Sequence, residues 1–127
     1  MKRYYFMAMF AVLGLQGLCA QEKKPIVLYC DINVDAAKEA QMLKTFHEVF
    51  FPEAKKYPGY IDLKLTKFRS AFVGKAPEGA QYRFQLTYES EEARQKWVKS
   101  DIHGKVWPQV ESLLSSKNYP CLIYDIK

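Results

Sequence analysis

The sequence lacks the residue groups that metal sites and the common nucleotide and acyl-transfer sites need. It has only two histidines and three cysteines, and none of them has the spacing of metal ligands. It also has no glycine-rich phosphate loop, no nucleophile motif and no internal repeat. We therefore expect neither a metal nor a cofactor, and the sequence argues against phosphate-loop enzymes and repeat proteins.

Charge of one sign is not concentrated in any segment either. Lys and Arg outnumber Asp and Glu by 19 to 14, for a formal net charge of +5, but the basic residues are scattered. Without a basic stripe interleaved with aromatic residues, nucleic acid is not an expected partner. The chain is instead rich in apolar residues, with 49% hydrophobic and 15% aromatic content. This content excludes a disordered protein, and 127 residues suffice for one domain.

The first twenty residues have the three-part pattern of a secretory signal peptide. Two basic residues precede an apolar run, residues 4–18, and Leu18-Cys19-Ala20 offers a cleavage site. The run has about fifteen residues, short of the roughly twenty that span a membrane, which disfavours an uncleaved anchor. A lipoprotein is disfavoured because Leu18 stands where a small residue should precede a modified Cys19. We expect cleavage after Ala20, a single mature domain of residues 21–127 with no membrane attachment, and a periplasmic or secreted protein.

Six segments of the mature chain have the periodicity of strands or helices. The strand-like segments are residues 26–32, 61–66, 82–88 and 121–126, and the helix-like segments are residues 36–50 and 91–114. Their order is βαββαβ. With right-handed crossovers in both halves, this order predicts a ferredoxin-like α+β fold. Its four-stranded antiparallel sheet has the order 4-1-3-2, and its helices cover one face.

Local signals refine the helices. Asp35 and Ser90 are suited to cap the two helix starts. Pro52 is expected to break or bend the first helix, with a further helical turn after it up to Lys56. The apolar pattern of the second helix is interrupted at residues 100–104, and Pro108 adds to the expectation of a kink or break in this region.

The second strand has one apolar face, because Ile61, Leu63 and Leu65 alternate with polar residues. Residues 71–79 are expected to form a hairpin loop, since they include two glycines and a proline.

The first and last strands are apolar on both faces and are neighbours in this fold. Cys30 and Cys121 therefore lie on adjacent strands, where a disulfide and a pair of buried thiols both fit the pattern. Because helices cover one face only, the other face leaves an apolar patch that monomers seldom tolerate. A second copy packed sheet to sheet removes that patch, so we expect a homodimer. Four polar residues of the other two strands limit the apolar area: Asp62, Lys64, Arg83 and Gln85.

Three segments carry a family resemblance. Residues 50–60 hold a Pro-Gly turn before a strand, residues 82–92 run from a strand into a helix, and residues 97–108 extend from one tryptophan past a second. In this order they resemble the antibiotic-biosynthesis-monooxygenase-like (ABM-like) family of dimeric α+β barrels, over essentially the whole mature domain. The resemblance implies a ligand pocket between the sheet and the helices.

Members of that family include cofactor-independent oxygenases of phenolic or quinol-like substrates, haem-degrading enzymes and proteins without known activity. The haem-degrading branch uses an Asn on the first strand, then a Trp and a His on the second helix. Trp97 matches that Trp, but Leu28 stands near the Asn position and Trp107 stands where the His is expected. The resemblance therefore does not imply haem degradation for this chain.

His103 is the candidate catalytic residue. It lies beside Gly104 in the interrupted stretch, and histidine titrates near neutral pH, so it could deprotonate a phenol. A helix-end histidine that contacts backbone carbonyls is the alternative. The candidate substrate-binding residues are aromatic: Trp97, Trp107, Tyr82, Phe84, Tyr88 and Tyr29. Ordinary core packing is the alternative for this group.

The remaining polar candidates are expected to lie at the protein surface or to pair across strands. His47 lies at the solvent edge of the first helix, and Arg83 and Lys64 either hold an anionic group or pair across strands, for example with Asp62. The leading expectation is an exported, cofactor-independent monooxygenase-like protein for a small aromatic or quinol-type molecule. The alternatives are a non-catalytic binding or stress-associated barrel protein, and haem binding through His103 or His47.

Overall fold

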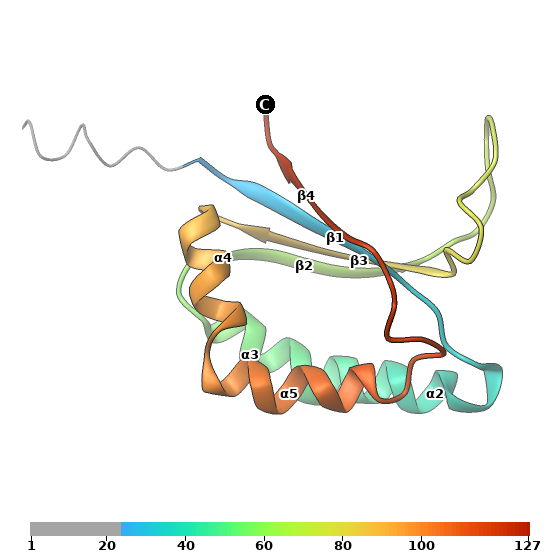
Figure 1. Ribbon diagram of the computed structural model, residues 1–127, viewed down its shortest axis with the longest axis horizontal. Coiled ribbons are helices and arrows are strands. Elements are labelled where there is room, and N and C mark those ends of the chain that lie inside the picture. Colours follow the sequence, from blue (N-terminus) through green and yellow to red (C-terminus); the bar gives the residue numbers. More distant parts are fainter. Residues whose placement is uncertain (1–23) are drawn as a thin grey trace, which may run out of the picture.

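The computed structural model describes residues 24–127, so the predicted signal peptide lies outside the described residues. The described chain forms two layers, a sheet and a set of helices that covers one of its faces (Figure 1). The strands are β1 (Ile26–Ile32), β2 (Tyr60–Lys67), β3 (Tyr82–Tyr88) and β4 (Cys121–Asp125). The helices are α2 (Ala36–Thr45), the π-helical turn η1 (Phe46–Phe50), α3 (Phe51–Lys56), α4 (Glu91–Val98) and α5 (Asp101–Glu111). Within residues 24–127, no helix has the length and apolar content needed to cross a membrane.

The sheet confirms the predicted ferredoxin-like α+β fold. Its order is β2-β3-β1-β4 and every neighbouring pair is antiparallel, which is the expected 4-1-3-2 arrangement. The core lies between the sheet and the helices. Among its most buried side chains are Ile32, Met42, Phe46, Phe50, Leu86, Trp97 and Val110. The other side of the sheet, which no helix covers, is called the open face below (Figure 1).

The first helix passes through Pro52 instead of breaking there. In η1 the backbone N–H of Phe51 bonds to the carbonyl of Phe46, five residues back, so the hydrogen-bond pattern shifts by one residue. Pro52 then falls in the first turn of α3, where a missing N–H costs least. Of the predicted break or bend, the break is wrong because the π-helical turn accommodates the proline, and the further turn expected up to Lys56 is present as α3.

The second helical segment divides at Ser100, the first residue of the stretch 100–104 where an interruption was expected. The Ser100 hydroxyl accepts a hydrogen bond from the backbone N–H of His103 and so starts a new helix, α5. Pro108 lies inside α5 without ending it, and Val110 one half-turn later is fully buried. The break was expected, but the irregular conformation of residues 101–104 was wrong, because a second capping serine follows the first.

The two predicted helix caps differ in their chemistry. Ser90 caps α4 as expected, accepting a hydrogen bond from the backbone N–H of Ala93 at 3.1 Å. Asp35 occupies the N-cap position of α2, but its side chain bonds to no backbone N–H of the helix. It accepts a hydrogen bond from the Ser115 hydroxyl at 3.3 Å instead, which links the start of α2 to the segment before β4.

A bulge changes the start of β2. Tyr60 pairs with Tyr88 and Asp62 pairs with Thr87, so Ile61 has no partner and is 52% exposed. Its predicted place on the apolar face is therefore wrong, whereas Leu63 is buried as expected.

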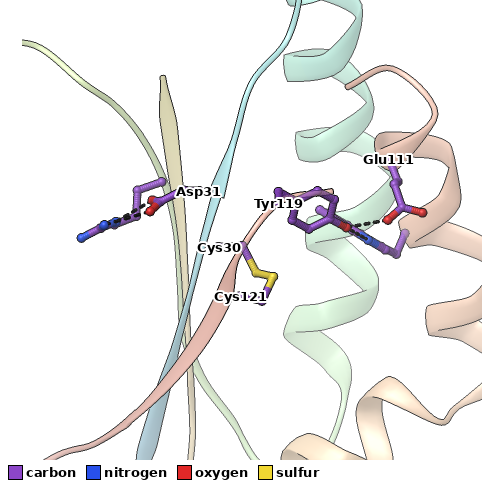
Figure 2. The surroundings of a disulfide bond; sticks show 7 residues. Cys30, Asp31, Glu111, Tyr119 and Cys121 are labelled. Carbon is purple, nitrogen blue, oxygen red and sulfur yellow. Dashed lines mark hydrogen bonds and ion pairs between the residues drawn. A yellow bond between two sulfur atoms is a disulfide. The ribbon is translucent and has the colours of Figure 1, made fainter. Parts of the chain in front are cut away.

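Cys30 and Cys121 form a disulfide between directly opposed positions of β1 and β4, with 4.1 Å between their Cα atoms (Figure 2). Of the two alternatives left by the sequence, the structure has the disulfide. Because β4 lies at the sheet edge and pairs only with β1, this bond ties the edge strand to the sheet.

Gly59, in the turn between α3 and β2, tests how closely this turn packs against α4. Its φ is +95°, and a Cβ at this position would lie 2.4 Å from the Cβ of Ala93. We expect Gly59→Ala to lower the free energy of unfolding by about 2–5 kcal/mol, the sum of left-handed strain and a clash. Gly74→Ala is the matched control, because Gly74 has a φ of +81° but no atom within 4 Å of a built Cβ. Equal losses for both variants in denaturant titrations would show that the close approach contributes nothing.

Candidate functional site

A cavity of about 230 Å³ lies between the helix-facing side of the sheet and the pair α4 and α5. It is lined by Leu28, Cys30, Phe50, Phe84, Leu86, Arg94, Trp97, Val98, His103, Trp107, Tyr119, Cys121 and Ile123. Aromatic rings, aliphatic side chains and the disulfide supply most of this lining. The cavity is therefore mainly apolar, and it lies between sheet and helices, where the family resemblance implies a pocket.

Two tryptophans and two phenylalanines form the aromatic wall of the cavity. Trp107 stacks on Phe84, with ring centres 5.6 Å apart and an angle of 18° between the planes. Phe50 meets Trp107 edge to face at 5.1 Å and Trp97 at 5.8 Å. Such pairs fix one another's orientation, so the wall is preformed.

A chain of two hydrogen bonds holds the Trp107 indole in place. Its Nε1–H donates to the Tyr119 hydroxyl at 3.0 Å, and that hydroxyl donates to the Glu111 carboxylate at 2.6 Å (Figure 2). Burial and the bond to Glu111 raise the pKa of Tyr119 to about 12, so the phenol stays protonated at neutral pH. Since its proton is committed to Glu111, Tyr119 acts on the cavity by orienting Trp107.

His103 is the imidazole of the cavity wall. It is half-buried in the first turn of α5, and its ring stands perpendicular to Trp97 at 5.1 Å and edge-on to Phe50 at 6.3 Å. Burial lowers its pKa, and the charge of Glu111 opposes this only in part. The imidazole is therefore neutral at pH 7 and able to accept a proton or a hydrogen bond.

The lowered pKa of His103 makes stability depend on pH in a defined window. The folded protein resists protonation that the unfolded chain accepts below its pKa of 6.5, so acidification favours unfolding. We expect the free energy of unfolding to fall from pH 7 to pH 5, and this slope to flatten in His103→Gln. Glu39 and Glu91 also have lowered pKa values, but their contribution to the free energy of unfolding is lost mainly below their ordinary pKa of 4.5. They therefore have little effect between pH 7 and pH 5. Parallel slopes for wild type and variant in denaturant titrations would contradict the prediction.

Arg94, from α4, adds a cation to the cavity lining. Its guanidinium donates to both carboxylate oxygens of Glu91 at 2.7 Å. This bond lowers the pKa of Glu91 to about 2 and raises that of Arg94. Arg94 was not among the predicted site residues, although it precedes Trp97 by three residues and therefore shares a helix face with it.

Phe50 and Tyr119 were also not selected as site residues. Phe50 belongs to the apolar stripe of the first helix, so core packing explained it fully. Tyr119 lies between α5 and β4 with no periodic pattern, and only the tertiary structure brings it to the cavity.

Of the predicted aromatic cage, Trp97, Trp107 and Phe84 line the cavity with His103, and the three tyrosines do not. Tyr82 and Tyr88 lie at opposite ends of β3, where Tyr82 donates a hydrogen bond to Glu39 and Tyr88 is buried in the core. Tyr29 lies on the open face, edge to face with Tyr124 at 5.4 Å. Strand alternation explains this last case, since Cys30, its neighbour in sequence, faces the cavity.

The remaining polar candidates lie outside the cavity lining. His47 is exposed. Arg83 forms a two-pronged ion pair with Asp31 at 2.8 and 3.1 Å, and Lys64 pairs with Asp62 at 3.2 Å. No group of three or more His, Cys, Asp or Glu side chains with metal-site geometry occurs among the described residues.

Comparison with solved structures identifies proteins of the same fold. A "putative antibiotic biosynthesis monooxygenase" from Caulobacter crescentus has a TM-score of 0.65 at 18% identity, covering 88% of this chain and 98% of that chain. A protein with the same description from Bordetella bronchiseptica has a TM-score of 0.61 at 14% identity, covering 82% and 96%. A dimeric ferredoxin-like protein of unknown function from Jannaschia sp. has a TM-score of 0.62 at 14% identity, covering 81% and 98%.

No family model matches the chain, and no curated protein matches it. At these identities the likeness to the solved structures concerns the fold. The chain therefore has the ferredoxin-like fold expected of an ABM-like domain, as the resemblance of its segments predicted.

Proposed function

We propose that this protein binds a small aromatic or quinol-type molecule in the cavity between α4, α5 and the sheet, and oxygenates it without a cofactor. The observation that carries this proposal is an apolar cavity with a preformed aromatic wall and one imidazole, His103. Solved structures described as antibiotic biosynthesis monooxygenases share its fold.

The size and lining of the cavity support a ligand of one or two rings. A dry apolar cavity of about 150 Å³ suffices for benzene, and this cavity has about 230 Å³. Trp97 and Trp107 offer faces and edges for stacking on an aromatic ligand. The lining offers few polar groups, so a strongly polar ligand would lose hydrogen bonds to water that the cavity does not replace.

The proposed reaction balances with the substrate as the source of electrons. A hydroquinone and O₂ give a hydroxyquinone and water: one oxygen atom enters a ring C–H bond, and the other leaves as water with the two hydrogens that the substrate loses. Neutral His103 accepts the phenolic proton, which makes the ring electron-rich enough to react with O₂.

The test is oxygen uptake with a panel of hydroquinones, with and without a metal chelator. We expect uptake above the buffer rate, water rather than hydrogen peroxide as the reduced product, and no effect of the chelator. His103→Gln should reduce turnover at least tenfold with the fold intact. His47→Gln is the matched control, because His47 is an exposed histidine outside the cavity lining, and it should keep full turnover.

Other outcomes identify the rival functions. Uptake at the buffer rate with measurable hydroquinone binding by fluorescence quenching of the tryptophans would indicate a non-catalytic binding protein. A Soret shift on titration with haem, lost in His103→Gln, would indicate haem binding.

We also propose that the protein is an exported homodimer in which the open faces of two copies pack together. The part of the open face on β1 and β4 carries the apolar residues Val27, Tyr29, Leu122, Tyr124 and, just after β4, Ile126, beside the charged residues Asp31, Arg83 and Asp125; we call the five apolar residues the apolar half. A solved structure of the same fold is described as dimeric. The disulfide supports export, because disulfides persist mainly in oxidising compartments such as the periplasm.

A further inference from the structure

The loop between β2 and β3 ends in an exposed apolar tip that the proposed catalytic chemistry does not use. At this tip, residues 69–75, the Phe72 side chain is 100% exposed and Val73 is 83% exposed. Phe68, just before the tip, is 51% exposed. Single exposed apolar residues are common, but three within six positions of one loop form a patch that needs an explanation.

The base of this loop is fixed to the domain, and its tip is not. The Phe68 N–H donates to the Gln81 carbonyl at 2.8 Å, which closes the hairpin. The Gln81 side chain accepts a hydrogen bond from the Val34 N–H, and the Gln81 N–H donates to the Asn33 side chain, both at 2.9 Å. Residues 69–75, in contrast, make no hydrogen bond or ion pair with the rest of the described chain. The hairpin therefore holds its apolar tip away from its own subunit.

The direction of the hairpin relates it to the open face. In Figure 1 the hairpin, drawn in yellow-green, rises from the end of β2 and β3 on the side of the sheet opposite the helices. β4 and the C-terminus lie on that same side. On β4, Leu122 and Tyr124 are about half exposed, at 50% and 52%. Two unpartnered apolar surfaces, the hairpin tip and the apolar half, thus project to one side of the subunit.

We propose that the hairpin tip is an arm that packs against a second copy of this chain seated on the open face. This inference rests on the proposed dimer and adds a contact outside the two sheets. Because a two-fold axis relates the copies, each dimer has two such arms, and every substitution in the tip acts twice. Burying a Phe or Val side chain favours association by roughly tenfold to a hundredfold.

A lipid surface is the rival occupant of the tip. Arg69 and Lys75 flank Phe72 and Val73, and such a combination also suits anionic lipid headgroups. The position of the arm favours the second copy, because a subunit seated on the open face lies on the side to which the tip points (Figure 1).

The test compares the mature wild-type protein with the double variant Phe72→Asp/Val73→Asp by sedimentation over a range of concentrations. We expect the dimer dissociation constant to rise at least a hundredfold, with circular dichroism and the melting temperature of the monomer unchanged. Ser70→Asp, which adds one carboxylate to the same tip without removing an apolar side chain, should keep the dimer. A photo-crosslinking residue at position 72 should give covalent dimers in the wild-type background.

Each contrary result is distinguishable. If the wild type is a dimer and the double variant dimerises equally well, the arm is refuted and the dimer stands. If the wild type is a monomer at micromolar concentration, the proposed dimer and the arm are both refuted. If the double substitution leaves the dimer unchanged but abolishes flotation with vesicles of phosphatidylglycerol and phosphatidylcholine, the tip binds membranes and the arm is refuted.

Discussion

Replacing Cys30 and Cys121 with alanine should lower the free energy of unfolding by about 2–5 kcal/mol, and the melting temperature by about 10 °C or more. The two residues are 91 positions apart, so their bond closes a loop that includes nearly the whole described domain. The double variant regains the conformational entropy of an open unfolded chain. It also frees the edge strand β4, which carries the cavity residues Cys121 and Ile123, so the proposed hydroquinone binding should weaken together with stability.

Reducing agent provides the control for this prediction. Dithiothreitol should lower the melting temperature of the wild type toward that of Cys30→Ala/Cys121→Ala, and it should leave the double variant unchanged. If the wild type and the variant have the same melting temperature under oxidising conditions, the hydrogen bonds between β1 and β4 hold the edge strand and the disulfide adds no stability.

Placing a charge on the apolar half should convert the proposed dimer to monomers. In Leu122→Asp or Tyr124→Asp the carboxylate replaces an exposed apolar side chain, so the subunit itself is little affected. In the proposed dimer the same carboxylate would be buried without a partner, once in each copy, and such burial is costly. We expect the dimer dissociation constant, measured by sedimentation, to rise at least a hundredfold.

Ala37→Asp is the control for this prediction, because Ala37 is exposed on α2, in the helical layer. It adds the same charge and should leave the dimer intact. Full dimerisation of Leu122→Asp and Tyr124→Asp would place the contact between copies elsewhere on the molecule.

The ion pairs of the open face explain how polar strands can lie beside an apolar surface. Asp31 and Arg83 face one another directly in the register of β1 and β3, and Lys64 pairs with Asp62 along β2. Their charges are thus paired within the subunit. A second copy in the proposed dimer would therefore cover the apolar half beside the paired Asp31 and Arg83, with Asp125 as the remaining charge at its edge.

Helix boundaries show where local sequence signals compete. Ser90 and Ser100 both cap helices, but the apolar pattern predicted a helix start only after Ser90. A break or bend was expected at Pro52 and a kink or break near Pro108, and neither proline ends its helix. A π-helical turn precedes Pro52, so that it lies in the first turn of α3, and burial of one face of α5 outweighs the cost of Pro108. Tertiary burial overrides a local preference of a few kcal/mol in such cases.

The sequence by itself determined the order of strands and helices, the sheet order and the two apolar faces of the terminal strands. Those features follow from hydrophobic periodicity and crossover handedness, which act along the chain or between whole elements. Tertiary structure alone decided which of the aromatic residues share a cavity. Strand alternation places Tyr29 on the open face, and the non-periodic segment before β4 places Tyr119 in the cavity lining. It also decided that the cysteines bond, because only the register of β1 and β4 sets their side chains face to face.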